Sequence, residues 1–350
     1  MSFLKMALPV LLAALLAAPA PLSTEDTSGV TAVKYVDQLP ESWSPMAEST
    51  PAGAFLLELT RQPLYRMDDQ GRMQPVLAAV PEDVTALYAG DSLFNVPYGA
   101  QRGYAFRIDL LPEANWQDGS PITAEAVAVT LEQLLAAGKL EQFPTPVNWE
   151  AYRAGKIPGN GQVISLEEAG FSTVEAAQQA GYTDFYVNLD KFWGLEQDWL
   201  PITDGTRLFD AAVQPGITER YVTAAYLYRQ YLATGMEYDY LQGEFLGISG
   251  NPEEKFTMAQ VGIQVTGHNQ ITLILQNPMV PTALMQALSY VNLLNPDRFG
   301  ADYCTSAETG DSCGAYMVTA VTDREIILER NPAYAGEQPE FTRVVCRLGE

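Results

Sequence analysis

The chain has 350 residues, of which 47% are hydrophobic and 18% are charged, so it can bury a packed core as one large or two compact units. Its formal net charge is −23, and no basic patch interrupts the acidity, which argues against nucleic acid and anionic membrane surfaces as partners. His268 is the single histidine, and the three cysteines form no Cys-x-x-Cys pair. These counts argue against a two-histidine zinc site, a zinc ribbon and a thioredoxin-type site. We expect no metal, no cofactor and no catalytic residues.

Residues 1–20 read MSFLKMALPVLLAALLAAPA and have the layout of a secretory signal peptide. Lys5 precedes an apolar run that is too short to span a bilayer comfortably, and Ala18-Pro19-Ala20 supplies small residues for cleavage. The alternative is an N-terminal membrane anchor. No cysteine follows the run, so a lipoprotein anchor is not available. We expect an exported protein, periplasmic or extracellular, which reaches the membrane through a transporter.

Export changes what the cysteines predict. Cys304 and Cys313 lie in one short stretch, YCTSAETGDSCGAY, and an oxidising compartment favours a disulfide between them. Closing so short a loop contributes about 2–3 kcal/mol in the chain-entropy description. Cys346 would remain unpaired. The alternative is three reduced thiols.

The first part of the chain predicts strands and one helix in alternation. Residues 30–36 alternate with β-branched side chains and predict a strand, and a loop with Trp43, Ser44 and Pro45 follows. Apolar spacing predicts a helix over 52–64. Next come two short strands around a turn at 68–71, and a half-buried strand over 104–110.

The second part continues the mixture. A turn at 115–119 precedes a helix over 124–137, which Thr123 caps and Gly138 ends. Residues 139–260, rich in aromatics and glycine, predict an insertion with helices at 173–180 and 218–234. The remaining predicted elements are a hairpin over 262–275 with exposed His268 in its turn, a helix over 281–288, and strands over 314–320, 325–329 and 344–348. The expected fold class is mixed α/β.

Four phrases occur in a fixed order along the chain: LYR with GRMQPVLA at 64–78, WQDGSPITAE at 116–125, GAY at 314–316, and LERNPAY at 328–334. This series resembles the bacterial extracellular solute-binding proteins of family 5, the peptide/nickel-binding receptors of ABC importers. The pair W-x-D-G and R-N-P-x-Y is the more specific signal. One departure is Ala126, which stands where the family usually has Asp, so no ligand role is assigned to that helix.

The resemblance implies a periplasmic binding protein type II-like fold, with a first lobe and an accessory subdomain. The implied division is a signal at 1–20, first-lobe parts at 21–138 and 261–350, and the accessory subdomain at 139–260. The sequence ends where the family's second lobe would begin, so we expect the chain to be truncated, with the second lobe largely missing.

The loop after the first predicted strand carries the candidate ligand-binding residues Trp43, Ser44, Ser49 and Thr50, because loops at strand carboxyl ends rim the crevice of open α/β sheets. Tyr316 is a further candidate, since it follows the glycine of GAY. We expect the Trp-x-Asp-Gly and Arg-Asn-Pro phrases to have structural roles.

The function implied by the resemblance is that of an exported, monomeric solute-binding component of an ABC importer, which closes around a small peptide or similar solute and delivers it to the permease. Two alternatives remain open: a truncated fragment that binds nothing, and a secreted carboxylate-dependent hydrolase. The hydrolase would need a pair of acids such as Glu167 with Glu168 or Glu196 with Asp198.

Overall fold

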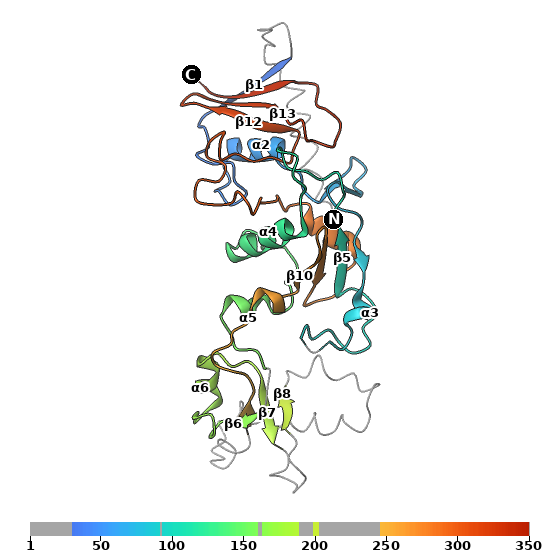
Figure 1. Cartoon of the computed structure of the whole chain (residues 1–350), viewed down its shortest axis with the longest axis vertical. Coiled ribbons are helices and arrows are strands. Elements are labelled where there is room, and N and C mark those ends of the chain that lie inside the picture. Colours follow the sequence, from blue (N-terminus) through green and yellow to red (C-terminus); the bar gives the residue numbers. More distant parts are fainter. Residues whose placement is uncertain (1–29, 92, 160–162, 189–198, 203–245, 350) are drawn as a thin grey trace, which may run out of the picture.

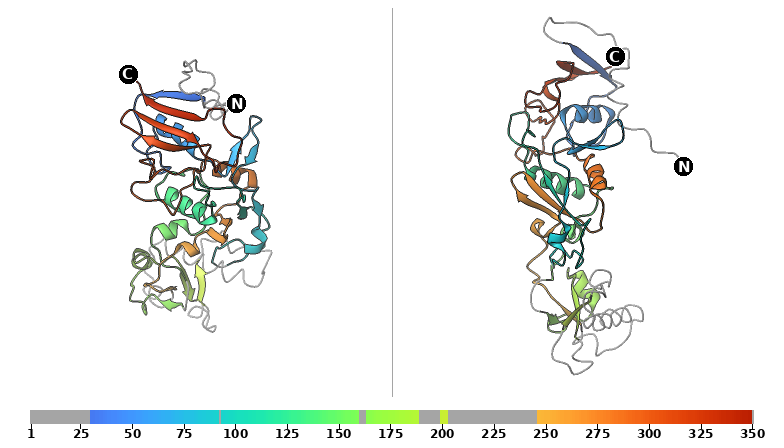
Figure 2. Two further views of the ribbon diagram at one scale, coloured as in Figure 1. Left: turned by 45° about the horizontal axis from the view of Figure 1, so that its top comes forward. Right: turned by 90° about the vertical axis from the view of Figure 1, so that its right-hand side faces the viewer.

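The computed structural model describes residues 30–91, 93–159, 163–188, 199–202 and 246–349. They form an elongated molecule in which three four-stranded sheets follow one another along the long axis (Figure 1), and β2 pairs with β3 in a further two-stranded sheet. Two further views show the same succession (Figure 2). The predicted signal at 1–20 and the predicted helix at 218–234 lie outside the described residues.

The sheet at one end joins the first described strand to the last. Its order is β1-β14-β13-β12, and β1 pairs with β14 in parallel, in a register that matches Thr31 with Arg343 and Val36 with Leu348. The other two pairings are antiparallel. The strands of this sheet are β1 (Thr31–Val36), β12 (Tyr316–Val321), β13 (Glu325–Arg330) and β14 (Arg343–Leu348).

Helix α2 (Pro51–Thr60) packs against this sheet through Phe55, Leu56 and Leu59. Thr50 caps the helix, because its side chain accepts a hydrogen bond from the Gly53 amide. The helix ends at Thr60, four residues earlier than the apolar spacing predicts. Pro63 explains the difference, since it lacks an amide hydrogen and disfavours helical geometry at the residue before it.

The central part holds the largest core, between a second sheet and its helices. The sheet order is β10-β11-β5-β4, and α4 contacts the β10–β11 hairpin. Thr123 caps α4 as predicted, and the Ala124 amide donates to the His268 carbonyl in the hairpin turn. The His268 side chain is exposed. The elements here are β2 (Tyr65–Met67), β3 (Met73–Pro75), β4 (Glu82–Asp83), α3 (Thr85–Tyr88), β5 (Ala105–Asp109), α4 (Ala124–Ala136), α5 (Trp149–Arg153), the 3-10 helix η1 (Met258–Gln260), β10 (Ile263–Gly267), β11 (Gln270–Ile274) and α10 (Pro281–Leu288).

A small unit at the far end has its own core, whose buried members run from Ile157 to Ile248. Its sheet order is β6-β9-β7-β8. Trp149 of α5 packs in the central core, so this separate core begins later than the predicted start of the insertion. The predicted division at 139 and 260 stays a prediction. The elements are β6 (Ile164–Ser165), α6 (Val174–Gln179), β7 (Phe185–Asn188), β8 (Trp199–Ile202) and β9 (Leu246–Ile248).

The chain enters and leaves the small unit at one point. A Cβ atom placed on Gly250 would lie 2.5 Å from the Pro158 carbonyl oxygen, so the two backbone segments touch. The sheets and helices together confirm the predicted mixed α/β class. In the part of the chain that the structure describes, no helix combines the length and the apolar character needed to cross a membrane.

Candidate functional site

The loop between β1 and α2 walls a hollow of about 280 Å³, which we call the loop hollow. The opposite wall is the first half of α2, and Lys139 closes one side after the end of α4. The lining residues are Ser42, Trp43, Ser44, Pro45, Ala47, Glu48, Ser49, Gly53, Ala54, Leu57 and Lys139.

Three predicted ligand-binding residues come together here: Trp43, Ser44 and Ser49 all line the loop hollow. Two do not. Thr50 caps α2, and Tyr316 is buried in the core between α2 and the terminal sheet, where its hydroxyl donates to the Phe341 carbonyl at 3.0 Å. The ligand roles of all five stay predictions.

Hydrogen bonds from within the loop and from two distant segments fix its shape. Ser44 Oγ accepts from the Met46 amide at 3.1 Å. Ser42 Oγ donates to the Tyr303 carbonyl at 3.2 Å, and the Trp43 amide donates to the Cys304 carbonyl at 3.0 Å. From the other side, Lys139 Nζ donates to the Ala47 carbonyl at 2.8 Å. The loop is therefore held before any ligand arrives.

Buried side chains support the loop from beneath. Trp43 is 1% exposed and Ser44 is 6% exposed, so the bottom of the loop hollow consists of side chains that pack into the protein. Trp43 Nε1 is buried and finds no acceptor in the described part of the chain. Edge positions such as Ser49 and Ala54 are exposed and remain available to a ligand.

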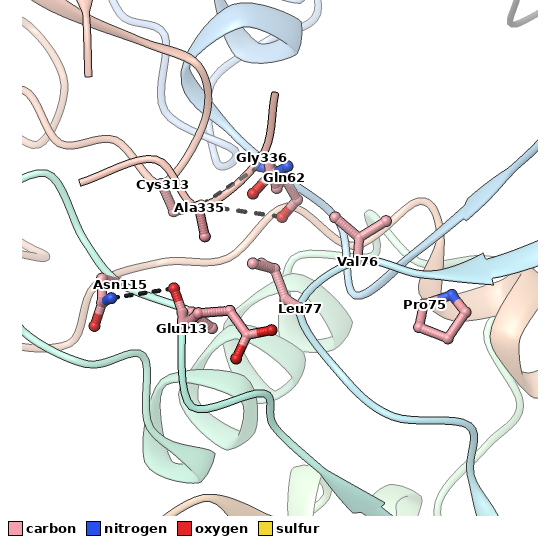
Figure 3. Close-up of a pocket in the computed structure, with 10 residues that line it drawn as sticks. Gln62, Pro75, Val76, Leu77, Glu113, Asn115, Cys313, Ala335 and Gly336 are labelled. Carbon is pink, nitrogen blue, oxygen red and sulfur yellow. Dashed lines mark hydrogen bonds between the residues drawn. The ribbon is translucent and has the colours of Figure 1, made fainter. Parts of the chain in front are cut away.

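A second hollow, of about 240 Å³, is lined by the first sequence phrase and by residues next to the other three, and we call it the motif hollow (Figure 3). Pro75, Val76 and Leu77 belong to the first phrase. The other lining residues adjoin α2 and the remaining phrases: Gln62, Glu113, Ala114, Asn115, Cys313, Ala335 and Gly336. Phrases far apart in sequence therefore build one region.

Asn331 ties two of these phrases together. Its Nδ2 donates to the Gly314 carbonyl at 2.9 Å, and its Oδ1 accepts from the Ala333 amide at 3.0 Å. Gly314 lies against the end of α2, where a Cβ atom would come within 2.5 Å of the Leu59 carbonyl oxygen. The sequence predicts a structural role for Arg-Asn-Pro, and these contacts agree with it.

The Trp-x-Asp-Gly phrase forms a turn. The Asp118 carboxylate accepts from the Ser120 hydroxyl at 2.5 Å and from the Ser120 amide at 2.9 Å, and these bonds lower the pKa of Asp118. Gly119 has φ of +84°, which favours glycine. The adjacent Gln117 amide donates to the Ser312 carbonyl at 2.7 Å, so the turn supports the segment that leads to Gly314.

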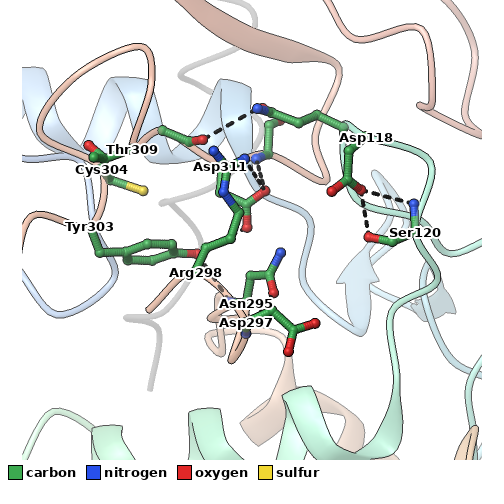
Figure 4. A network of polar contacts seen from close by, with 12 residues as sticks. Asp118, Ser120, Asn295, Asp297, Arg298, Tyr303, Cys304, Thr309 and Asp311 are labelled. Carbon is green, nitrogen blue, oxygen red and sulfur yellow. Dashed lines mark hydrogen bonds and ion pairs between the residues drawn. The ribbon is translucent and has the colours of Figure 1, made fainter. Parts of the chain in front are cut away.

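A buried polar cluster, which the sequence patterns did not indicate, follows the end of α2. It contains Arg61, Tyr303, Cys304 and Asp311, and Figure 4 shows the last three with Arg298 nearby. Burial raises the pKa of Asp311, and the positive charges of Arg61 and Arg298 oppose that rise. The sequence feature that could have indicated this cluster is a single arginine, Arg61, between an apolar helix and Pro63.

All three cysteines are buried free thiols, so the structure gives no support to the predicted Cys304–Cys313 disulfide, which stays a prediction. Burial raises the pKa of the Cys313 and Cys346 thiols to about 11 and that of Cys304 by an amount that the Arg61 charge offsets in part. A raised thiol pKa leaves little thiolate, the reactive form, at neutral pH.

We therefore expect slow alkylation of the folded protein by iodoacetamide at pH 8, roughly 100-fold slower than that of the unfolded chain. Mass spectrometry after unfolding in guanidinium without reductant is expected to show modification of all three cysteines. A single modification, at Cys346, would contradict the free thiols and establish the disulfide. Fast modification of the folded protein would contradict the burial.

Comparisons with known proteins give structural neighbours only. No protein-family model matches the chain, and no curated protein matches its sequence. Listeria monocytogenes OppA bound to peptide has a TM-score of 0.45 and 12% identity, over 91% of this chain and 42% of that one. The Escherichia coli murein tripeptide binding protein MppA has a TM-score of 0.46 and 13% identity, over 93% and 42%. Haemophilus influenzae OppA in complex with RPPGFSPFR has a TM-score of 0.46 and 13% identity, over 94% and 43%.

The chain thus spans less than half the length of these neighbours. Two of these neighbours hold a peptide, and the third is a murein tripeptide binding protein.

Proposed function

We propose that this chain is the solute-binding component of an ABC importer, exported as a monomer, which binds a small peptide or similar solute and delivers it to a membrane permease. Residues 21–138 and 261–350 would form one lobe, with 139–260 as an accessory subdomain. The role requires no catalytic group and no cofactor.

The loop hollow is the observation that carries the proposal. Ligand sites are concave, pre-formed and apolar with a few polar groups, and the loop hollow combines serines and backbone groups with Trp43 and Leu57. Its volume of about 280 Å³ is near the lower end of the usual range for ligand sites, about 300–1,000 Å³. This size suits one side chain or one end of a peptide.

The hydrolase alternative has no comparable support. Glu168 accepts hydrogen bonds from the Ser165 amide and hydroxyl, which is a local turn contact. Glu167 is exposed beside it, and Glu196 and Asp198 lie outside the described residues.

Calorimetric titration with peptide mixtures of defined length, from two to eight residues, tests the proposal. We expect measurable heat with at least one length, and a variant Ala54→Trp to weaken that binding by about tenfold or more, equivalent to about 1.4 kcal/mol. Ala54 is an exposed lining residue, so tryptophan there fills the loop hollow while the buried face of α2 stays intact.

Glu125→Trp is the matched control, because Glu125 is exposed on α4 and is not among the lining residues. It is expected to bind like the unmodified chain. No heat with any peptide length would sink the proposal and favour the non-binding fragment, and equal binding by Ala54→Trp would place the ligand elsewhere.

A further inference from the structure

Arg61 follows α2 directly and is 2% exposed, in an extended backbone conformation that turns its side chain into the core. A fully buried arginine is uncommon unless its donors find partners. None of the ion pairs between described residues includes Arg61. Its guanidinium is therefore held by uncharged acceptors and aromatic rings, together with the electrostatic attraction of the nearby Asp311 carboxylate.

The groups that contact the guanidinium come from Trp116 and from the segment 303–311. Nη2 donates to the Tyr303 hydroxyl at 2.9 Å and to Cys304 Sγ at 3.2 Å, and Nη1 donates to the Asp311 carbonyl. The guanidinium carbon lies 5.6 Å from the Tyr303 ring centroid and 5.9 Å from that of Trp116, within cation–π range. Arg61 thus contacts both ends of the 303–311 segment.

The two residues that Nη2 contacts are the same residues that hold the loop. The Tyr303 carbonyl accepts from Ser42 Oγ, and the Cys304 carbonyl accepts from the Trp43 amide. Tyr303 is fixed further because its hydroxyl donates to Asp311 Oδ2 at 3.2 Å. Tyr303 and Cys304 therefore connect the guanidinium directly to the wall of the loop hollow. Each contacts Arg61 through its side chain and the loop through its main-chain carbonyl.

We propose that Arg61 is a positioning residue for ligand binding: through Tyr303 and Cys304 it holds residues 42–47 in the shape that lines the loop hollow. This inference rests on the proposed function for its consequence, although the positioning itself is independent of any ligand. The planar guanidinium reaches three acceptors from two nitrogen atoms held in a fixed fork, whereas an ammonium group offers its three donors from a single nitrogen atom.

Hydrogen exchange read by mass spectrometry tests the positioning. In Arg61→Lys and Arg61→Met, the amides of Trp43, Ser44, Met46 and Ala47 are expected to exchange about tenfold faster, corresponding to about 1.4 kcal/mol of lost local protection. The amides of β11, in the central sheet, are expected to keep their rates. Tyr303→Phe removes only the hydroxyl that accepts from Arg61 and is expected to give the same local effect. It replaces the arginine variants in the test if these fail to fold.

Arg66→Met is the control, since Arg66 is exposed on β2 and should leave both regions unchanged. Unchanged exchange at 43–47 in every variant of the cluster would overturn the proposal. Equal acceleration in β11 would also overturn it, because it would make Arg61 a support of global stability alone.

Peptide titration of Arg61→Lys separates this inference from the proposed function. If the unmodified chain binds peptide, Arg61→Lys is expected to weaken binding about tenfold while its melting temperature stays close to that of Arg66→Met. If the unmodified chain binds nothing, the proposed function fails and the exchange experiment still decides the positioning.

Discussion

Gly314→Ala is expected to destabilise the folded protein by about 3 kcal/mol or more, because the added Cβ atom meets only backbone. It would lie 2.5 Å from the Leu59 carbonyl oxygen, 2.6 Å from the Thr60 carbonyl carbon and 2.7 Å from the Arg61 nitrogen. Backbone at the end of a packed helix cannot yield as a flexible side chain can. Urea unfolding followed by circular dichroism measures the change.

Gly300→Ala is the control for this substitution. A Cβ atom at Gly300 meets nothing within 4 Å, and its φ is not positive. We expect a change within about 0.5 kcal/mol. A Gly314→Ala protein as stable as Gly300→Ala would show that α2 and the GAY segment are not in close contact.

Removal of residues 158–249, with Ile157 joined to Gly250 through a short Gly-Ser turn, is expected to leave the remaining protein folded. The excised part carries all described members of its buried core except Ile157, and the chain enters and leaves it where Pro158 and Gly250 touch, so the junction needs little rearrangement. The terminal and central sheets should lose no more than about 1 kcal/mol, a shift of about 2–4 °C in melting temperature. Thermal unfolding by circular dichroism measures it.

Deletion of the β10–β11 hairpin, residues 263–274, is the contrasting variant. Ile263, Ile271 and Leu273 are buried in the central core, so this smaller deletion is expected to abolish folding. An aggregated product from the larger excision would contradict the independence of the small unit, and retained peptide binding would show that the unit does not contribute to the loop hollow.

Local patterns in the sequence were sufficient where the structure is decided locally. The cap at Thr123, the stop at Gly138, the turn that exposes His268 and the helix over 281–288 all occur as predicted. In each case the deciding interaction lies within a few residues along the chain.

Local sequence patterns do not predict which distant segments come into contact. The parallel pairing of β1 with β14 and the Arg61 cluster join segments about 250 residues apart or more, as in the Arg61 bond to Asp311. Apolar periodicity also overran the end of α2, since periodicity records the buried face and not the effect of Pro63.

In the candidate site too, local features could be predicted from the sequence and long-range packing could not. Trp43, Ser44 and Ser49 could be placed on one loop from the position of the first strand alone. Lys139 and α2 complete the loop hollow only through tertiary packing. Tyr316 is the first residue of β12 and is buried between α2 and the terminal sheet, and its ligand role stays a prediction.

The parallel pairing of β1 with β14 also governs the order in which the protein can fold. Among the described strands β1 lies at the edge of its sheet, beside β14, and a hydrogen bond from Thr342 Oγ1 to the Val30 carbonyl spans 312 residues. Pairings of such high sequence separation form slowly, because the entropic cost of closing the long loop precedes the stabilising free energy of the contacts. β1 can therefore pair with β14 only after residues 343–348 have been synthesised.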